Sequence, residues 1–289
     1  MLITNKFNYP SAFVNAVTAH AGESEKRIFQ YPERMGVTTL IDSPRIPRLL
    51  KEKYALIEAD VDDWYELLDG VAWDTLLTKY APEEVRSQIK LELNISGVVL
   101  VGKLDVWLPT EGIIADYKRC KVAALRFEHD DWIKQLNCYA YLVRKVMEVE
   151  VKKLVIYPLL KDWRILEGWR EDKDYPPNRI PAFELPLWTT EQQEQYIKDQ
   201  LHCHLAARDY KCSDEERWKK PSTWAVMKEG RKAALRLLDS QALAQKWSVE
   251  NGWELSKNGV FIVERQGEYA MCKHYCSVRS VCALAKEMI

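Results

Sequence analysis

The spacing of the apolar residues changes at Gln88, and this change limits the possible folds more than any other feature of the sequence. Upstream, residues 60–77 place apolar side chains three and four positions apart, which predicts a helix with one apolar face. Downstream, apolar and polar residues alternate through 89–95, which predicts a strand with one buried face. Gly97 ends this strand, and 98–108 predicts its hairpin partner. A helix followed by a hairpin favours a mixed α/β domain.

The following segments extend this α/β pattern. Residues 109–112 predict a turn, and 113–118 predict a third, buried strand. Asp130 or Asp131 is expected to cap a helix that runs to Met147, because both residue types accept hydrogen bonds from helix N-termini. Residues 151–159 predict another strand. We therefore expect a mixed central sheet flanked by helices.

The remaining segments are less regular, and they suggest three parts. Prolines interrupt residues 1–50, so 1–60 is expected to be an irregular and partly helical N-terminal segment. The core should occupy 61–211, with an edge strand at 183–187 and a long helix from Thr190 to about Tyr210. A cysteine-rich C-terminal extension at 212–289 should dock on this core, with a helix near 228–247 and a short strand at 260–263.

Composition excludes several classes of protein. Of the 289 residues, 47% are hydrophobic and 29% are charged, as in ordinary globular proteins. The longest aliphatic run is residues 98–101, which is too short to span a membrane, and residues 1–9 contain no apolar stretch of signal-peptide length. Seven cysteines, an odd number, favour a reducing compartment and a metal or cluster over a disulfide framework. The formal net charge of −1 means that a polyanion would have to bind in a local groove.

Two carboxylates and a lysine are expected to converge on the predicted sheet. Asp116 and Lys118 occupy alternate positions of the third strand and therefore share a face, about 6–7 Å apart. The hairpin can bring Asp105 beside them from the neighbouring strand. Burying two acids is costly unless a cation compensates, and oxygen ligands suit Mg²⁺ or Mn²⁺. The ammonium group could then orient or activate a water molecule. Alone, an Asp-x-Lys pair is more often part of a solvated strand.

Three motifs in order then resemble a known family. They are Gly102-Lys-Leu-Asp105, Ala115-Asp-Tyr-Lys118 and Gln135-Leu-Asn-Cys-Tyr139, the last with Gln135 and Tyr139 on one helix face. Together they resemble the PD-(D/E)XK nuclease superfamily, and most closely its RecB-like exonuclease branch, which includes AddB-type and CRISPR-associated nucleases. The resemblance covers about residues 64–160 and implies an α/β PD-(D/E)XK nuclease core.

The resemblance also implies roles for these residues. Asp105, Asp116 and the Tyr117 carbonyl would bind Mg²⁺ or Mn²⁺, and Lys118 would position or activate the attacking water. Gln135 and Tyr139 would line the DNA side of the site.

One position departs from the family pattern. The RecB-like branch usually carries Gly-x-x-x-His on an upstream helix, whereas this chain has Gly70-Val-Ala-Trp-Asp74. A carboxylate is also a hard ligand, so Asp74 is expected to take the place of the histidine at the metal site. The alternative is that Asp74 is an ordinary polar helix residue.

A second metal site is expected at the end of the chain. Cys272, Cys276 and Cys282 lie close together in sequence, and structural zinc and iron–sulfur sites both require four ligands. The AddB-like and CRISPR-associated nucleases are similar here, with a [4Fe-4S] cluster on three C-terminal cysteines and one distant cysteine. The spacing in this chain, three and then five residues, differs from their two and then five.

The fourth ligand leaves more alternatives open. The relatives have their distant cysteine before the nuclease core, but this chain has none before Cys120. Cys212 is the first candidate, with Cys120 and His274 as alternatives. We expect a [4Fe-4S] cluster, with Zn²⁺ as the second possibility, or three reduced thiols in a packed terminal helix as the plainer interpretation.

These features together predict a metal-dependent DNA exonuclease of recombination, repair or phage genome processing. Its expected partners are DNA ends and a separate helicase or recombination protein, since the sequence has no complete P-loop motif. The expected location is the cytoplasm of a bacterium or a phage-infected cell, with no membrane association. Two other functions remain open: a catalytically silent nuclease fold that serves as a DNA-binding scaffold, and a zinc-stapled nucleic-acid-binding module.

Overall fold

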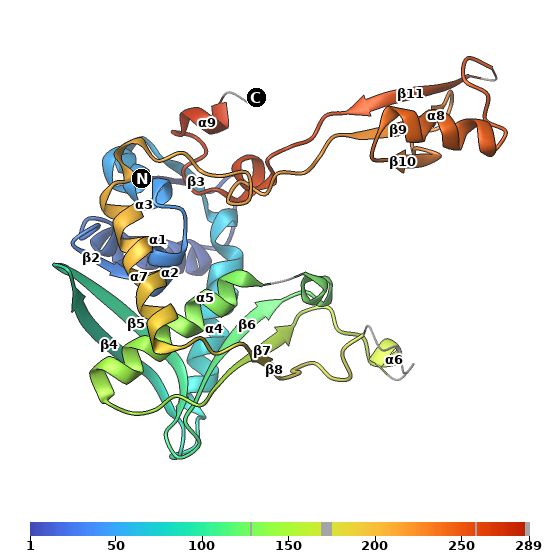
Figure 1. The fold of residues 1–289 in the computed structure, drawn as a ribbon. Helices are drawn as coiled ribbons and strands as arrows, with labels where there is room; N and C mark the ends of the chain where they lie inside the picture. Colours follow the sequence, from blue (N-terminus) through green and yellow to red (C-terminus); the bar gives the residue numbers. More distant parts are fainter. Residues whose placement is uncertain (128, 169–174, 258, 287–289) are drawn as a thin grey trace. The chain divides into compact units, whose positions relative to one another are not determined.

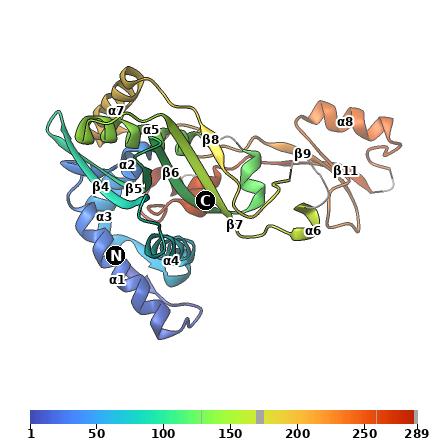
Figure 2. The same ribbon diagram turned by 90° about the horizontal axis from the view of Figure 1, so that it is seen from below.

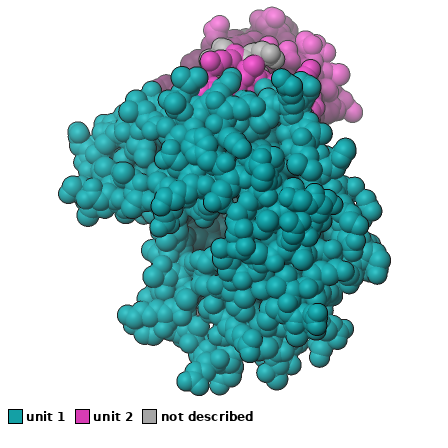
Figure 3. Space-filling model, turned by 90° about the vertical axis from the view of Figure 1, so that its left-hand side faces the viewer, with its two compact units in different colours: residues 1–210 teal, residues 211–289 magenta. Residues whose placement is uncertain are grey.

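The computed structural model describes residues 1–127, 129–168, 175–257 and 259–286 (Figure 1). The chain divides into two compact units, unit 1 at residues 1–210 and unit 2 at residues 211–289 (Figure 3). Within the described residues, no helix has the length and apolar character that crossing a membrane requires.

Unit 1 is built around a six-stranded mixed sheet. Its strands follow the order β2-β5-β6-β7-β8, and β4 also pairs with β5. The β4–β5, β5–β6 and β7–β8 pairs are antiparallel, whereas β2–β5 and β6–β7 are parallel. The strand bounds are β2 Arg34–Gly36, β4 Arg86–Ile95, β5 Val98–Leu108, β6 Ile113–Cys120, β7 Lys153–Leu160 and β8 Phe183–Leu185. The mixed α/β architecture predicted from the sequence is confirmed.

Helices cover both sides of this sheet. Figure 2 shows α5 and α7 on one side and α4 on the other. The α-helices of unit 1 are α1 Ser11–Ile28, α2 Val37–Ile41, α3 Arg45–Lys53, α4 Tyr65–Lys79, α5 Asp130–Leu142, α6 Ile165–Gly168 and α7 Thr190–Leu205. Shorter helical turns are η1 Tyr54–Leu56, η2 Val61–Trp64, η3 Val122–Arg126, η5 Ala207–Asp209 and the π-helical η4 Val143–Met147.

The main core of unit 1 lies between α5 and the sheet. Leu136 and Leu142 of α5 are fully buried there with Leu100, Ile114 and Ile156 from the strands. The connection from β6 through α5 to β7 makes these two strands parallel, because a helical crossover returns the chain to the same end of the sheet. The core therefore fixes the position of α5 over β5 and β6.

The N-terminal region is more helical than the sequence predicted. Three of its four prolines stand at helix starts, and Pro32 lies in the turn before β2: Pro10 precedes α1, Pro44 precedes α3, and Pro47 lies in the first turn of α3. Proline lacks an N–H group that the first turn of a helix leaves unpaired in any case, so it is tolerated there. The segment is thus partly helical, as expected, but its helices are longer than the prolines suggested.

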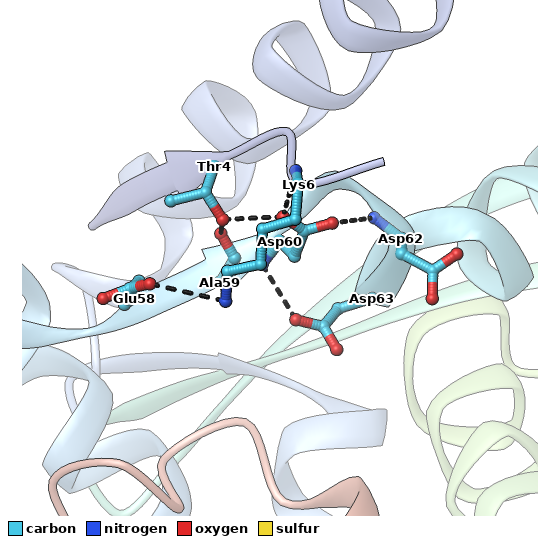
Figure 4. A network of polar contacts seen from close by, with 7 residues as sticks. All are labelled: Thr4, Lys6, Glu58, Ala59, Asp60, Asp62 and Asp63. Carbon is cyan, nitrogen blue, oxygen red and sulfur yellow. Dashed lines mark hydrogen bonds and ion pairs between the residues drawn. The ribbon is translucent and has the colours of Figure 1, made fainter. Parts of the chain in front are cut away.

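A polar network joins the first strand, β1 (Leu2–Thr4), to β3 (Glu58–Asp60) (Figure 4). The Asp60 carboxylate accepts hydrogen bonds from Thr4 Oγ1 at 2.6 Å and from the Lys6 backbone N–H at 3.0 Å. It also accepts from the Asp62 N–H at the start of η2. These donors, led by the Thr4 hydroxyl, lower the pKa of Asp60. The network stands at the start of η2, which α4 follows directly.

Two predicted helix starts differ in their outcome. Thr189 caps α7 and accepts a hydrogen bond from the Gln192 N–H, so this helix begins at Thr190 as predicted. In α5 the residue before the helix is His129, and no side chain caps it; Asp130 and Asp131 instead occupy the first turn. Carboxylates in a first turn are favoured by the helix dipole. The two aspartates therefore do lie at the start of the helix, but in its first turn and not at the capping position.

The described part of unit 2 contains a small sheet and three helical segments. Its sheet has the order β10-β9-β11 and is antiparallel throughout. The bounds are β9 Thr223–Lys228, β10 Arg236–Leu238, α8 Gln241–Glu250, β11 Val260–Arg265, the π-helical η6 Met271–Tyr275 and α9 Ala283–Lys286. The strand predicted at 260–263 is present. The helix predicted near 228–247 is only partly so, because Gly230 turns the chain with φ 79° and the helix begins after Ser240.

Candidate active site

Three carboxylates of unit 1 come together beside the sheet. Asp105 on β5 and Asp116 on β6 flank the paired residues Val106 and Ala115, so they lie on adjacent strands. Asp74 reaches the same place from α4, and its pKa is raised by burial first and then by repulsion from Asp116. Asp116 is only 3% exposed. The structure thus brings together all three acids that the sequence singled out for the metal site.

Asp105 has the most perturbed environment of the three. Burial, followed by repulsion from Asp116 and Asp74, raises its pKa to about 7. The Tyr117 backbone N–H donates a hydrogen bond to Asp105 Oδ2 at 3.3 Å and opposes this shift, as does the charge of Lys118. A carboxyl group that tends to hold a proton near neutral pH, among other acids, marks a place where positive charge is missing.

Lys118 is held on the other side of the cluster. Its Nζ lies 2.8 Å from Asp116 Oδ2 and donates a hydrogen bond to Gln135 Oε1 at 2.7 Å. An ammonium group has three N–H donors, so these two contacts fix the side chain and leave one donor for a water molecule or a phosphate oxygen. Asp116 and Lys118 therefore share a face of β6, as the alternation of residues predicted.

Gln135 and Tyr139 form a chain of hydrogen bonds behind this lysine. Gln135 Nε2 donates to the Tyr139 hydroxyl at 2.9 Å, and both side chains are buried, at 6% and 4% exposure. Burial, followed by repulsion from Asp116, raises the pKa of Tyr139, so the hydroxyl keeps its proton. Gln135 thus contacts Lys118 rather than an open surface, whereas Tyr139 also lines a cavity.

The sequence interpretation missed Gln88. This residue lies opposite Asp105 in the β4–β5 hairpin, between the pairs Ser87–Val106 and Ile89–Leu104. Its Nε2 donates to Asp74 Oδ1 and, at 3.4 Å, to Asp105 Oδ1. Counting back along the predicted hairpin from Asp105 would have identified it, but its residue type alone gave no signal.

The acids are of the chemical type that binds a divalent cation, although their carboxylates do not surround a single point. Among the described residues, no three His, Cys, Asp or Glu side chains stand at the spacing of metal ligands. The raised pKa of Asp105 and the burial of Asp116 nevertheless indicate a negative cluster that Lys118 compensates only in part, and oxygen-binding Mg²⁺ or Mn²⁺ would neutralise the rest. Asp74, Asp105, Asp116 and the adjacent Tyr117 carbonyl are the groups that would hold it.

A cavity of about 970 Å³ begins at this site. Tyr139 and Lys103 belong to its wall, and Lys103 lies close enough to Asp74 for its charge to oppose the rise in the pKa of that acid. Further basic residues of the wall are Arg27, Arg34 and Lys90, the last two paired with Glu92. The face of unit 1 in Figure 3 is visibly hollowed. The carboxylate cluster is therefore bordered by a basic, partly aromatic cavity.

The C-terminal cysteines gather within unit 2. Cys272, Cys276 and Cys282 are buried. Burial raises the pKa of Cys276 to about 11, and the neighbouring thiols of Cys272, Cys282 and Cys212 add to the rise. The thiols of Cys212, Cys272 and Cys282 thus lie near enough to Cys276 to act on its pKa, although among the described residues no three cysteines stand at the spacing of metal ligands. Four cysteines are a ligand set that suits zinc or an iron–sulfur cluster.

Cys120 and His274, the two alternatives for the fourth ligand, have different surroundings from Cys212. Cys120 ends β6 in unit 1, where burial and then Asp162 raise its pKa. His274 Nε2 lies 3.8 Å from Glu268 Oε2, and its side chain is 48% exposed. Neither Cys120 nor His274 is among the groups that shift the pKa of Cys276.

A comparison with protein families shows to which family this chain belongs. The family model of the PD-(D/E)XK nuclease superfamily matches residues 37–283. Among solved structures, SSO0001 is 14% identical with a TM-score of 0.44, and the match covers 67% of this chain and 89% of that one. A phage-related exonuclease from Haemophilus somnus 129PT is 13% identical with a TM-score of 0.35, covering 59% and 91% respectively. A search of the curated proteins finds no match. Because the family model spans most of the sequence, this chain belongs to the PD-(D/E)XK nuclease superfamily.

Proposed function

We propose that this protein is a divalent-metal-dependent deoxyribonuclease that degrades DNA from an end. The observation that carries this proposal is the arrangement of Lys118 between Asp116 and Gln135, beside Asp105 and Asp74. Three acids provide oxygen ligands for Mg²⁺ or Mn²⁺, and the lysine provides a fixed positive donor. Asp74 supports activity rather than a silent scaffold, because it joins the acid cluster through Gln88.

Each residue has a distinct part in hydrolysis. A bound Mg²⁺ or Mn²⁺ would supply positive charge to the scissile phosphate and make a bound water more acidic. Asp74, Asp105, Asp116 and the Tyr117 carbonyl would bind the cation. Lys118 keeps one N–H donor for the attacking water or for a phosphate oxygen. Gln135 orients Lys118 through its carbonyl, and the Tyr139 hydroxyl orients Gln135 in turn.

The basic cavity supports a single DNA strand as the bound form of the substrate. Arg27 and Lys103 supply positive charge to its wall, and Tyr31 and Tyr139 supply aromatic surface. Proteins that hold single strands combine these two features, since cations attract the backbone and rings stack on bases. The cavity begins at Tyr139, so a strand lying in it would end at the carboxylates.

The test is a comparison of linear and circular DNA. Purified protein in Mn²⁺ should degrade linear single-stranded DNA and leave a circular single strand intact. Arg27→Ala with Lys103→Ala should weaken single-strand binding and reduce the salt slope by about 0.7 for each phosphate that the variant no longer neutralises. Lys26→Ala is the matched control, because Lys26 neighbours Arg27 on α1 but does not line the cavity. Cleavage of the circle at the same rate would refute the requirement for an end.

For unit 2 we propose a metal centre on Cys212, Cys272, Cys276 and Cys282, with a [4Fe-4S] cluster first and Zn²⁺ second. The proximity of the other three thiols to Cys276 supports it. A buried thiol with a raised pKa stays protonated at neutral pH when no metal is present. A bound metal displaces this proton, because cysteine binds metals as the thiolate. Anaerobic purification with iron and zinc analysis tests the proposal: a brown protein containing iron supports the cluster, and a colourless protein containing zinc supports the alternative.

A further inference from the structure

The backbone of Gln88 is held in an unusual conformation. Its φ is 57°, in the left-handed region, and among the described residues it is the one non-glycine inside a strand with a positive φ. Other described residues with this feature, such as Ser96, lie in turns or loops. Strained backbone inside a regular element is kept where the position of the side chain matters.

Only one of the two polar atoms of the Gln88 side chain makes hydrogen bonds. Its Nε2 bonds to both Asp74 and Asp105, but its Oε1 is buried and has no hydrogen-bond partner in the described part of the chain. A buried carbonyl without a partner is uncommon in a folded protein and calls for a physical reason. The amide thus presents its donors to the acids and leaves its acceptor unused.

We propose that Gln88 is a further ligand of the divalent cation, and that its amide alternates between two roles. Without the cation, its NH₂ group bridges Asp74 and Asp105 and separates their charges. When the cation binds, the amide turns over by about 180°, a change that exchanges O and N in nearly the same volume. Oε1 then faces the place between the two acids and binds the cation. This inference rests on the proposed metal-dependent function.

The charge of the site explains why an amide suits this position. Three acids already converge, and two of them, Asp74 and Asp105, accept hydrogen bonds from Gln88 Nε2. A glutamate would add a fourth negative charge in the cation-free protein, whereas an apolar residue would give the cation no oxygen. Glutamine provides donors in one state and a hard oxygen ligand in the other.

Mn²⁺ binding to purified, EDTA-treated protein tests this role without relying on cleavage. Binding is measured by titration calorimetry on wild type, Gln88→Met and Gln88→Glu. Methionine matches the length of glutamine but offers only a soft thioether, so Gln88→Met should weaken Mn²⁺ binding at least tenfold. Gln88→Glu keeps an oxygen ligand, so it should bind Mn²⁺ at least as tightly as wild type while its cation-free form melts at a lower temperature.

The control is Gln195→Met, which removes the exposed hydrogen bond from Gln195 to Asp199 on α7 and should leave Mn²⁺ affinity unchanged. The inference is overturned if Gln88→Met binds Mn²⁺ like wild type, or if Gln88→Met and Gln88→Glu lose affinity equally, since the amide would then only orient the acids. If wild type cleaves DNA and binds Mn²⁺ in either of these cases, the proposed function stands. If wild type binds no Mn²⁺, both the function and the ligand role fail.

Discussion

Replacing Asp105 with asparagine should make the cation-free protein more stable at alkaline pH. Burial and the neighbouring acids raise the pKa of Asp105 from 3.8 to about 7. The native state therefore binds this proton more tightly than the unfolded chain does, and stability falls as pH rises from about 4 to about 7. At about 1.4 kcal/mol for each pKa unit, the ionised carboxylate costs up to about 4 kcal/mol at pH 8.

Asparagine removes this cost but also loses a hydrogen bond. Asp105 accepts from both Gln88 Nε2 and the Tyr117 N–H, whereas an amide has one acceptor oxygen, so the loss is about 1 kcal/mol. Asp105→Asn should thus be about 1–3 kcal/mol more stable than wild type at pH 8, and about 1 kcal/mol less stable at pH 4.

Urea unfolding in EDTA between pH 4 and pH 9 measures this difference. Asp199→Asn, which changes an exposed acid on α7, is the control and should show no change of sign. A destabilisation by Asp105→Asn that is the same at both ends of the pH range would refute the reasoning, because burial and the neighbouring acids would then not raise the pKa of Asp105 in the folded protein.

Three further predictions concern the lysine, the residues behind it and the cysteines. Lys118→Ala should lower the DNA cleavage rate about 100- to 10,000-fold with unchanged circular dichroism; near wild-type cleavage would refute its assignment. Gln135→Ala should cost about 100-fold or less by releasing Lys118, and Tyr139→Phe should cost less again; losses as large as that of Lys118→Ala would indicate a structural role for α5. Cys282→Ser should lose bound iron or zinc and melt at a lower temperature before cleavage declines, and a variant as stable and as metal-loaded as wild type would exclude the site.

The antiparallel strands at the centre of the sheet could be predicted because local sequence determines them, whereas the short strand β2, which pairs with β5 from far away in the sequence, was not predicted. Alternation from Ile89 to Ile95, the Gly97 turn and the apolar strand at 113–118 each depend on neighbours in sequence, and all appear in the structure. The membership of the PD-(D/E)XK superfamily, which short motifs on two of these strands and on α5 indicated, is confirmed.

The positions of the N-terminal helices could not be predicted, for a physical reason. Proline both ends helices and begins them, and only packing decides between the two outcomes. In α1, Val17 and Ala21 are buried on one face, which stabilises a helix after Pro10 that local propensity did not reveal.

Gln88 was missed because its role depends on three elements at once. Its side chain meets Asp74 from α4 and Asp105 from β5, and its backbone conformation is unusual for a strand. The proximity of Cys212 to Cys276 is a tertiary feature of the same kind, since more than sixty residues separate the two in sequence. Sequence patterns report short-range order, so they leave such partners undetermined.

The most direct test of the central claim is cleavage of end-labelled linear DNA by wild type and Asp116→Ala, each in Mn²⁺ and in EDTA. Asp116 is almost fully buried, contacts Lys118 and lies beside Asp105. We predict that wild type shortens the DNA in Mn²⁺ and not in EDTA, and that Asp116→Ala, folded by circular dichroism, leaves it intact in both. Cleavage by wild type in EDTA, or by Asp116→Ala in Mn²⁺ at the wild-type rate, would contradict the carboxylate cluster as the site of a metal-dependent nuclease.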